Sequence, residues 1–475
     1  MSSRLLIGLV AVTMVSPLLV NQLYAYSSDQ WNKTVQRVKP AIVSIRGYRP
    51  VWSRREKASS YEATGFLVDS RRGIILSNRH VVGASPNVAR AVFTNRDEVE
   101  LRQLYVDPTH DFGFFQFDPS SVRFSLVEVP LGDSDLLMPG EEIRVLGNNA
   151  GLDLSILAGT VSRTKRNPPF YGLATYNDQN IFYIQTSADT SGGSSGGPVI
   201  NIRGEVVALN AGGISGASAA FELPINAPKR ALRLLQNGLP IHRGTMGIRL
   251  FYASFRMLEM LGVPQSSLKK VREDGPTLDG MIVVDDTLPG LEAHDLIEPG
   301  DVLVDVEGTP IRDNYEELEE ILDRSIGKSV AIRLWRGGRS FSLSLAVHDL
   351  ADFEIEEIVT VGAATFHKVP IELVYDNNVP IQGVYCAQAF LMMLREGINP
   401  NIIITKLAGE PIETVSEFVA MMRRLSNGQT VRLDYLDLNE RNQLKIGSFQ
   451  IEKNWFPLVR HLKKRESARW SVLLQ

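Results

Sequence analysis

The sequence predicts a mainly β protein in which an all-β barrel or sandwich precedes two related α+β units. Apolar strand-like runs begin at residues 41–45 and recur at short spacing through the first two hundred residues, separated by Gly, Asn and Asp. The second half repeats itself, since Gly308 and Gly409 open the same pattern 101 positions apart. A chain of 475 residues exceeds one hydrophobic core and should form roughly three domains.

The composition is that of an ordinary globular protein, with 44% hydrophobic and 22% charged residues. A net charge of −4 and the lack of a basic stripe with interleaved aromatic residues argue against bulk nucleic-acid binding. The one cysteine, Cys386, excludes an internal disulfide, and its apolar context predicts a core residue. We expect the basic run 463–465 to be a solvated end.

The N-terminus has the pattern of a secretory signal peptide over residues 1–25. Arg4 precedes an apolar run over 5–20, and Leu23-Tyr24-Ala25 offers a small-residue cleavage site. The alternative is an uncleaved membrane anchor, because the run approaches the length that spans a bilayer. Either case predicts an exported protein, periplasmic or secreted, with the second one held at a membrane.

Two polar residues stand where predicted strands begin or end. Residues 65–69 and 73–77 read as a hairpin, and its second strand leads directly to His80. Asp111 precedes a strongly apolar strand and should be partly buried, so it needs a partner such as a histidine N–H. Either residue alone is more often structural than functional.

A glycine-dense stretch, residues 186–198, lies between predicted strands at 181–184 and 199–200. Its glycines allow the N–H groups of Gly193 and Ser195 to converge beside the Ser195 hydroxyl. Seen alone, such a loop is more simply a surface turn with an idle serine. Joined with His80 and Asp111, in that chain order, it indicates a serine nucleophile, its base and the group that orients the base.

Residues 41–235 resemble the HtrA/Deg family of trypsin-like serine proteases. The resemblance implies a chymotrypsin-like double β-barrel, placed at residues 26–236, and no metal or organic cofactor. It also implies that His80 is the general base, Asp111 its orienting partner and Ser195 the nucleophile, with an oxyanion hole at Gly193, Ser194 and Ser195. The motifs that carry it are Ala63-Thr64-Gly65-Phe66, Ser77-Asn78-Arg79-His80-Val81-Val82, His110-Asp111-Phe112-Gly113, Gly159-Thr160-Val161-Ser162 and Gly193-Ser194-Ser195-Gly196-Gly197-Pro198-Val199.

The chain departs from the family pattern at two places. Residues 147–151 replace a common Asn-Pro-Phe-Gly, and Glu222 stands where an apolar residue is usual. A Glu222 that pointed into the S1 pocket would favour basic P1 residues, but we expect a rim or salt-bridged position, and P1 preference stays open. By resemblance, residues 163–180 are the activation loop and 211–216 line the specificity pocket. We expect these loops to leave the oxyanion hole incomplete in the free enzyme.

The repeated second half predicts two similar domains, at residues 241–348 and 355–455, before a C-terminal tail at 456–475. The first copy resembles a PDZ domain through 296–303 and 306–311, which implies that Thr245, Met246, Gly247 and Ile248 form its peptide-carboxylate loop. The alternative is an interdomain packing strand. The second copy keeps the strand, glycine, helix and strand order without a recognisable carboxylate loop, and we expect it to be structural.

The second half is also similar to a branch of HtrA-like proteases best known from eukaryotic nuclei, in which such a half is duplicated. This chain has one such half and an export-like N-terminus, so a nuclear location is not carried over. The expected activity is that of a serine endopeptidase acting on unfolded or damaged proteins, as in protein quality control. The expected partners are C-terminal peptides at the first PDZ domain and other copies in a homotrimer. Alternatives are a peptide-binding chaperone or scaffold with a latent protease domain and, less favoured, a simple esterase.

Overall fold

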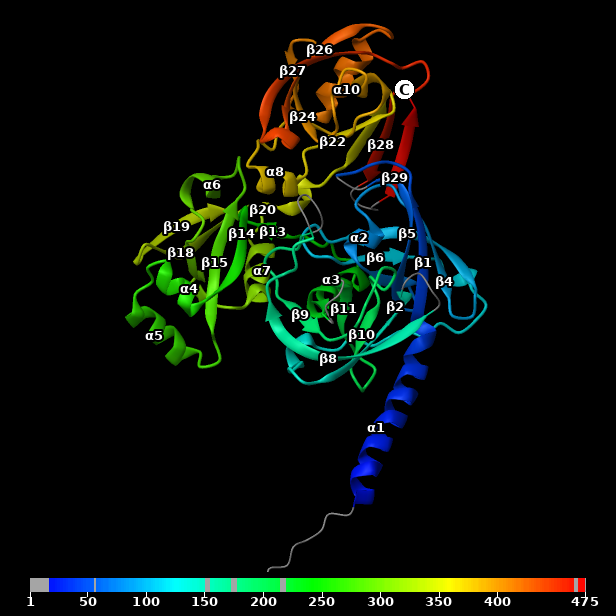
Figure 1. The fold of residues 1–475 in the computed structure, drawn as a ribbon, viewed down its shortest axis with the longest axis vertical. Helices are drawn as coiled ribbons and strands as arrows, with labels where there is room; N and C mark the ends of the chain where they lie inside the picture. The colour runs from blue at the N-terminus through cyan, green and yellow to red at the C-terminus, as the bar shows by residue number, and fades with distance from the viewer. Residues whose placement is uncertain are drawn as a thin grey trace, which may run out of the picture.

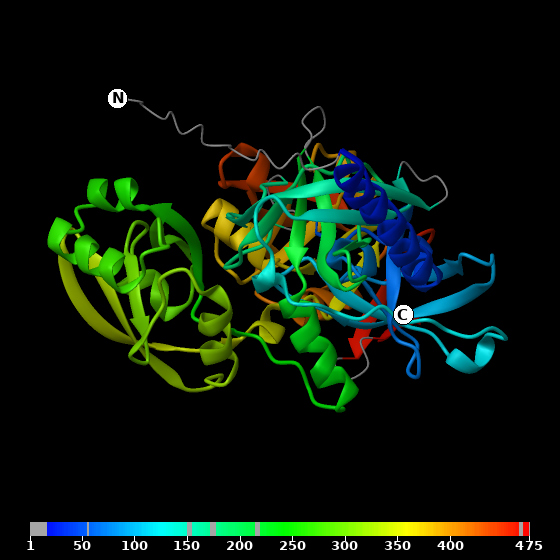
Figure 2. The ribbon, with the colours of Figure 1, turned by 90° about the horizontal axis from the view of Figure 1, so that it is seen from below.

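The computed structural model describes residues 17–54, 57–149, 154–171, 177–213, 219–464 and 469–474. Within these residues the protein is mainly β, and two closed six-stranded barrels precede two open antiparallel sheets. This confirms the predicted fold class. Figure 1 shows the barrels side by side, with the second sheet above them and the first to one side; Figure 2, seen from below, shows the same displacement of the first sheet.

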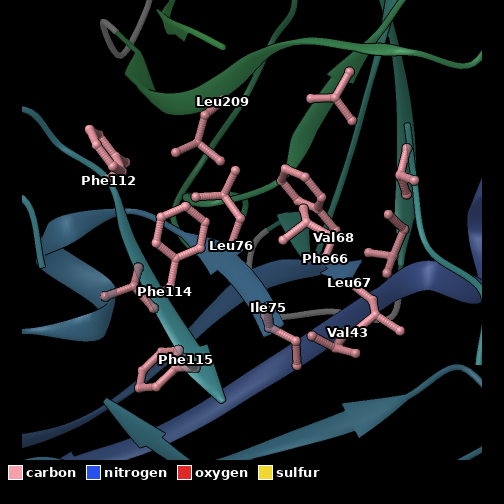
Figure 3. Close-up of a cluster of buried hydrophobic side chains, with 14 of the residues drawn as sticks. Val43, Phe66, Leu67, Val68, Ile75, Leu76, Phe112, Phe114, Phe115 and Leu209 are labelled. Atoms are coloured by element: carbon pink, nitrogen blue, oxygen red, sulfur yellow. The ribbon is translucent and has the colours of Figure 1, made fainter. Parts of the chain in front are cut away.

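The first barrel closes in the order β1-β2-β3-β6-β5-β4. Strands β2 and β3 pair as the predicted hairpin, and the short helix α2 (Arg79–Val82) follows β3. Phe66, Leu76 and Phe114 from different strands meet in its core, and Leu209 of the second barrel joins them (Figure 3), so one apolar cluster crosses both barrels. The strands are β1 (Ile42–Arg49), β2 (Ser59–Asp69), β3 (Ile74–Ser77), β4 (Val88–Phe93), β5 (Glu98–Val106) and β6 (Gly113–Gln116).

The second barrel closes in the order β10-β11-β12-β9-β8-β7. Strand β11 pairs with β10 on one side and with β12 on the other. Helix α3 (Asn226–Gln236) leaves the barrel toward the second half. The strands are β7 (Glu142–Gly147), β8 (Ser155–Arg166), β9 (Tyr183–Thr186), β10 (Pro198–Ile200), β11 (Val206–Gly213) and β12 (Ala220–Pro224).

The first open sheet is antiparallel and has the order β14-β15-β16-β18-β19, and β17 pairs with β16. Helix α7 begins after Asn314, whose side chain accepts a hydrogen bond from the Glu317 N–H at 3.1 Å, as an N-cap does. A two-stranded ribbon of β13 and β20 brackets the unit. Its elements are β13 (Gly244–Thr245), β14 (Ile248–Ser254), α4 (Phe255–Met260), α5 (Gln265–Asp274), β15 (Gly280–Thr287), α6 (Glu292–Leu296), β16 (Val302–Val306), β17 (Thr309–Pro310), α7 (Tyr315–Asp323), β18 (Ser329–Arg336), β19 (Arg339–Ala346) and β20 (His348–Asp349).

The second open sheet is antiparallel and has the order β27-β26-β24-β23-β22-β21-β28-β29, and β25 pairs with β24. Helix α10 begins with a capping box, in which Thr414 and Glu417 each bond the other's backbone N–H. The elements are β21 (Glu357–Val361), β22 (Ala364–Lys368), α8 (Ile371–Asn377), β23 (Val384–Gln388), α9 (Leu391–Leu394), β24 (Ile402–Leu407), β25 (Glu410–Pro411), α10 (Val415–Arg424), β26 (Thr430–Asp437), β27 (Gln443–Gln450), β28 (Val459–Lys464) and β29 (Arg469–Leu474).

The sequence repeat corresponds to a structural repeat. The order β14-β15-β16-β18-β19 of the first sheet matches β22-β23-β24-β26-β27 of the second, and β17 and β25 occupy the same place beside the third strand. The turn before β17 holds Glu307 and Gly308 at positive φ, and Ala408 and Gly409 repeat this before β25. The matched glycines therefore mark turns that require left-handed backbone.

The prediction of a C-terminal tail at residues 456–475 was wrong. Residues 459–464 and 469–474 form the hairpin β28–β29, and β28 pairs with β21, so this segment extends the second sheet. Lys463, expected in a solvated end, forms an ion pair with Glu354 at 3.3 Å. The local sequence could not show this, because the hairpin pairs with a strand about a hundred residues earlier.

Helix α1 (Pro17–Val38) covers part of the predicted signal peptide, whose first sixteen residues lie outside the described ranges. The C-terminal part of α1 packs on the second barrel: Trp31 is buried and its Nε1–H donates to Glu142 Oε2 at 2.9 Å. Among the described residues, no helix is long and apolar enough to span a membrane. Cleavage after Ala25 would leave the packed turns on the protein.

A buried arginine joins the first barrel to the unit built on the first open sheet. Arg243 Nη1 lies 2.7 Å from Asp107 Oδ2, next to β6, and its guanidinium also bonds Glu319 on α7. Burial alone would raise the pKa of Asp107, but the charge of Arg243 holds it below its usual value. The ion pair therefore fixes α7 beside the loop that contains Asp111.

We predict that Arg243→Met lowers the stability of this junction by about 3–5 kcal/mol, because Asp107 would keep a buried charge without its partner. Thermal unfolding followed by circular dichroism should show a lower first transition than in the native protein. Arg339→Met, at an exposed position of β19, is the matched control. Equal transition temperatures for the two variants would contradict a structural role for the Arg243 cluster.

Candidate active site

The glycine-dense stretch forms the loop between β9 and β10, as predicted. Gly193 and Gly196 have φ of 95° and 82°, values that L side chains rarely adopt. The Ser194 N–H donates to the Ser191 carbonyl at 3.2 Å, and the Gly197 N–H donates to the Ser194 carbonyl at 2.9 Å. These consecutive turns present Ser195 at the tip of the loop, half-buried.

Close contact with the first barrel holds this loop at the junction of the barrels. The Ser195 carbonyl accepts a hydrogen bond from the Thr64 N–H at 2.9 Å. A Cβ on Gly196 would lie 2.1 Å from Ser77 Oγ and 2.2 Å from the Thr64 carbonyl oxygen. Only glycine fits there, and the contact brings Ser195 to the end of β3, three residues before His80.

Among the backbone donors of the loop that have no acceptor in the described residues, two flank Ser194. These are the N–H groups of Gly193 and Ser195, the pair expected to hold an oxyanion. Ser194, also expected in the oxyanion hole, differs because its N–H is bonded to Ser191. Its hydroxyl donates to the same carbonyl and accepts from Asn210 Nδ2 at 3.1 Å. Ser194 therefore shapes the loop rather than offering a donor.

His80 and Asp111 lie together, as the sequence predicted. The His80 ring Nδ1 is 2.8 Å from Asp111 Oδ2 and 3.0 Å from Oδ1, and the His80 backbone N–H donates to Oδ1 at 3.0 Å. The His80 side chain is 30% exposed and that of Asp111 only 2%. Because Nδ1 faces the carboxylate, Nε2 is the ring nitrogen that can exchange a proton with a substrate or a hydroxyl.

A second buried carboxylate, Asp178, supports Asp111. Asp178 Oδ2 accepts hydrogen bonds from the Asp111 N–H at 2.9 Å and the Tyr183 hydroxyl at 2.8 Å. Buried Arg79 faces its other oxygen at 3.6 Å. Burial would raise the pKa of Asp111, but His80 and Arg79 lower it, whereas burial raises the pKa of Asp178 to about 8. Asp111 is therefore the ionised partner of His80.

Sequence reasoning did not single out Asp178, because it lies in the irregular segment 163–180 without a motif. The described parts of that segment, 163–171 and 177–180, contact the active site. The Tyr171 ring lies over Gly212 at the end of β11, where an added Cβ would be 3.0 Å from its hydroxyl. Burial and the charges of Asp111, Asp178 and Glu222 raise the Tyr171 pKa. Residues 172–176, 150–151 and 214–216 of the predicted loops lie outside the described residues.

Glu222 does not occupy the expected rim or salt-bridged position. Its side chain on β12 is fully buried, and Oε1 accepts a hydrogen bond from Thr186 Oγ1 at 3.0 Å. In the described part of the chain, no Lys, Arg or His pairs with it. The expectation was wrong because all four residues from Ala220 to Leu223 are buried, so strand alternation did not turn Glu222 toward solvent.

The predicted carboxylate loop, Thr245 to Ile248, leads into β14 at the edge of the first open sheet. Gly247 has φ of 73°, its N–H donates to Thr245 Oγ1 at 3.0 Å, and its carbonyl accepts from the Leu288 N–H at 2.8 Å. The Met246 and Ile248 side chains are buried in the core of the unit. Gly247 turns the loop, but the apolar side chains of the loop already have partners.

The chain itself covers the open edge of β14. Asn180 bonds the Ile248 carbonyl and the Leu250 N–H at 3.2 and 2.8 Å, and Asn167 bonds the carbonyl and N–H of Tyr252 at 3.1 and 3.0 Å. The Phe182 ring packs against Tyr252 on β14 and Tyr315 on α7, with centroids 5.2 and 5.0 Å apart. The alternative of an interdomain packing strand therefore describes the arrangement seen.

In the second open sheet, other strands cover the edge that corresponds to the open edge of β14. Strand β22 takes the place of β14, and its outer side pairs with β21, which in turn pairs with β28. A peptide cannot add to an edge that already carries a hydrogen-bonded strand. This explains why no carboxylate loop was recognisable in the second copy.

Cys386 and His110 contact other parts of the fold and lie outside the His80–Asp111 pair. Cys386 is fully buried, its thiol lies 3.9 Å from Met393 Sδ, and burial raises its pKa, as expected for a core residue. His110 adjoins Asp111, but its Nε2 faces the Gln179 carbonyl at 3.0 Å and Glu319 at 3.1 Å. Within the described ranges, no three His, Cys, Asp or Glu side chains are grouped to hold a metal ion.

A double barrel with a His–Asp pair at its junction and a Gly-x-Ser-Gly-Gly loop defines the class of trypsin-like serine peptidases. The family model described as a trypsin-like peptidase domain matches residues 63–209, and the one described as a PDZ-like domain matches residues 354–427. The chain therefore contains a trypsin-like peptidase domain and a PDZ-like domain.

Two curated proteins are similar to the chain over most of its length. The chain is 37% identical over 460 residues to "Protease Do-like 7" of Arabidopsis thaliana, covering 94% of this chain and 42% of that protein. It is 37% identical over 434 residues to "Pro-apoptotic serine protease NMA111" of Debaryomyces hansenii, covering 91% and 44%. The chain thus spans less than half the length of these relatives.

A solved structure, "HtrA-type protease AlgW with tripeptide", shares the fold. It has a TM-score of 0.50 and 21% sequence identity, and the match covers 67% of this chain and 97% of that one.

We predict that Gly196→Ala abolishes reaction of Ser195 with a fluorophosphonate, because the added Cβ would clash with Ser77 and Thr64 and displace the loop. Gly192→Ala is the matched control, since a Cβ there meets nothing within 4 Å. Normal labelling of the Gly196 variant, with both variants folded by circular dichroism, would contradict this account of the loop.

Proposed function

We propose that the protein is a serine endopeptidase that uses Ser195, His80 and Asp111. The observation that carries the proposal is the His80–Asp111 pair, 2.8 Å apart, beside a loop that leaves two N–H donors and the Ser195 hydroxyl without a partner among the described residues. A structural turn would satisfy its own donors, whereas a catalytic loop reserves them for substrate.

The chemistry follows from the residue types. Ser195 Oγ attacks a peptide carbonyl while His80 Nε2 accepts its proton, and His80 then gives that proton to the departing amine. Asp111 holds the productive tautomer and stabilises the imidazolium. The N–H groups of Gly193 and Ser195 stabilise the oxyanion, each lowering the barrier by about 3 kcal/mol. Water hydrolyses the acyl-enzyme by the reverse proton route.

The substrates we propose are unfolded or damaged polypeptides, whose C-terminal segments bind along Thr245–Ile248 and β14. The support is a hydrolytic site joined to a unit with an edge strand and a turned glycine loop. Because Asn167, Asn180 and Phe182 cover that edge, a peptide must displace them. The segment that moves also carries Tyr171 and Asp178, so peptide binding at β14 should change the surroundings of Asp111 and, with them, the activity.

We also propose export, with residues 1–25 serving as a signal peptide or an anchor, and assembly as a homotrimer. The support for export is the N-terminal sequence pattern. Sequencing of the mature N-terminus after expression in the source cell tests the first proposal, and light scattering of the purified chain tests the second.

Fluorophosphonate labelling and casein degradation test the catalytic proposal. The native chain should label and degrade casein, while Ser195→Ala should do neither, because it lacks the nucleophile. Ser191→Ala, in the same loop, is the control and should still label. A native chain that binds unfolded protein without labelling would favour the alternative of a peptide-binding chaperone or scaffold.

A second test addresses the covered edge. We predict that replacing Asn167 and Asn180 together by Ala strengthens binding of a hydrophobic C-terminal peptide by about tenfold, because the competing bonds to β14 are lost. Fluorescence anisotropy measures this, and the same peptide with an amidated C-terminus is the control. Unchanged affinity in the double variant would show that the edge is not the peptide site.

A further inference from the structure

Glu222 is a buried carboxyl that the catalytic mechanism does not use. It is fully buried, and one oxygen, Oε2, has no hydrogen-bond partner among the described residues. Its only bonded neighbour is the Thr186 hydroxyl. A buried carboxyl without a cation is costly, and such groups collect at functional sites. Its position therefore needs a chemical reason.

The fold places Glu222 directly behind the nucleophile loop. Glu222 stands opposite Asn210 in the register of β11 and β12. Asn210 exchanges backbone hydrogen bonds with Gly196 and Gly197 and donates to Ser194 Oγ. Thr186, which bonds Glu222, begins the same loop on β9. The carboxyl thus lies between the first residues of the loop and the strand that carries its other end.

A second unsatisfied acceptor lies beside the first. Asn210 Oδ1 is buried and has no partner within the described ranges. Residues opposite one another on antiparallel strands share a face, with Cβ atoms about 4.5–5.5 Å apart. Two acceptor oxygens with too few donors form a site for a donor-rich group, and a cationic one suits the carboxyl.

The strand that carries Asn210 also contacts the nucleophile loop. At the end of β11, a Cβ on Gly213 would lie 3.3 Å from Thr190 Oγ1, so this strand packs against the loop. The Tyr171 ring lies over neighbouring Gly212, and its phenol senses the charges of both Asp111 and Glu222. One side chain is therefore near the catalytic carboxylate and near Glu222.

We propose that Glu222 forms the base of the P1 side-chain pocket and selects Lys or Arg as the residue after which the chain cuts. This inference rests on the proposed serine endopeptidase function and adds its substrate class. An Arg guanidinium has donors enough for both Glu222 Oε2 and Asn210 Oδ1, so Arg should be at least as good as Lys. Burial raises the pKa of Glu222 to about 8, so the resting carboxyl holds a proton that it releases to water when the cation binds.

A matched peptide series tests the inference. Fluorogenic peptides that differ only at P1, with Arg, Lys, Gln, Val or Leu, are assayed with the full-length native chain and with Glu222→Gln. We expect kcat/KM for Arg and Lys to exceed that for Val and Leu by about a hundredfold in the native chain. Glu222→Gln should lose most of this preference, so that its kcat/KM for the Arg and Lys peptides approaches its kcat/KM for the Val and Leu peptides.

Two further measurements separate the possible failures. Benzamidine should inhibit the native chain competitively and Glu222→Gln at least about tenfold less, while Glu100→Gln, 88% exposed on β5, should behave as native. Fluorophosphonate labelling of Ser195 does not depend on a P1 side chain. Labelling with a preference for Val or Leu, or with an Arg preference that survives Glu222→Gln, overturns this inference alone. No labelling and no cleavage by the native chain overturn the endopeptidase proposal and this inference with it.

Discussion

The candidate active site depends on the contact between Gly196 and the first barrel. The nucleophile loop belongs to the second barrel, whereas His80 and Asp111 belong to the first, so the three groups meet only if the barrels approach closely. The missing Cβ of Gly196 permits that approach, because Ser77 Oγ and the Thr64 carbonyl occupy the space that a side chain would need. The Thr64 N–H then bonds the Ser195 carbonyl. The apolar cluster shared by both barrels, which includes Phe66 and Leu209, stabilises the same junction.

The segment from Asn167 to Phe182 links this junction to the first open sheet. Asp178 supports the Asp111 backbone, while Asn167 and Asn180 take the hydrogen bonds that an added strand would make along β14. Since one short segment makes both sets of contacts, displacing it from β14 must disturb the surroundings of Asp111. The Arg243 cluster adds a second connection, from α7 to the loop before β6.

The two repeated units differ in what covers the same strand edge. In the first unit, as far as the chain is described, the side chains of Asn167, Asn180 and Phe182 cover β14, and such contacts can be exchanged for a peptide. In the second unit β21 and β28 continue the sheet with backbone hydrogen bonds, which requires unfolding a strand to expose the edge. The same fold therefore provides one exchangeable edge and one permanent edge.

Local sequence determined the class of fold, the repeat and the residues of the candidate triad. Strand-length apolar runs, glycines at turns that need positive φ and a Gly-x-Ser-Gly-Gly loop depend on interactions within a few residues, so their pattern is visible in one dimension. Only the tertiary structure decided the positions of Glu222 and Asp178, the covered edge of β14 and the pairing of residues 459–474 with β21. Each of these depends on strands or segments that are distant in the chain. Alternation along β12 could not show that neighbouring strands and the nucleophile loop bury Glu222, which was expected at a rim.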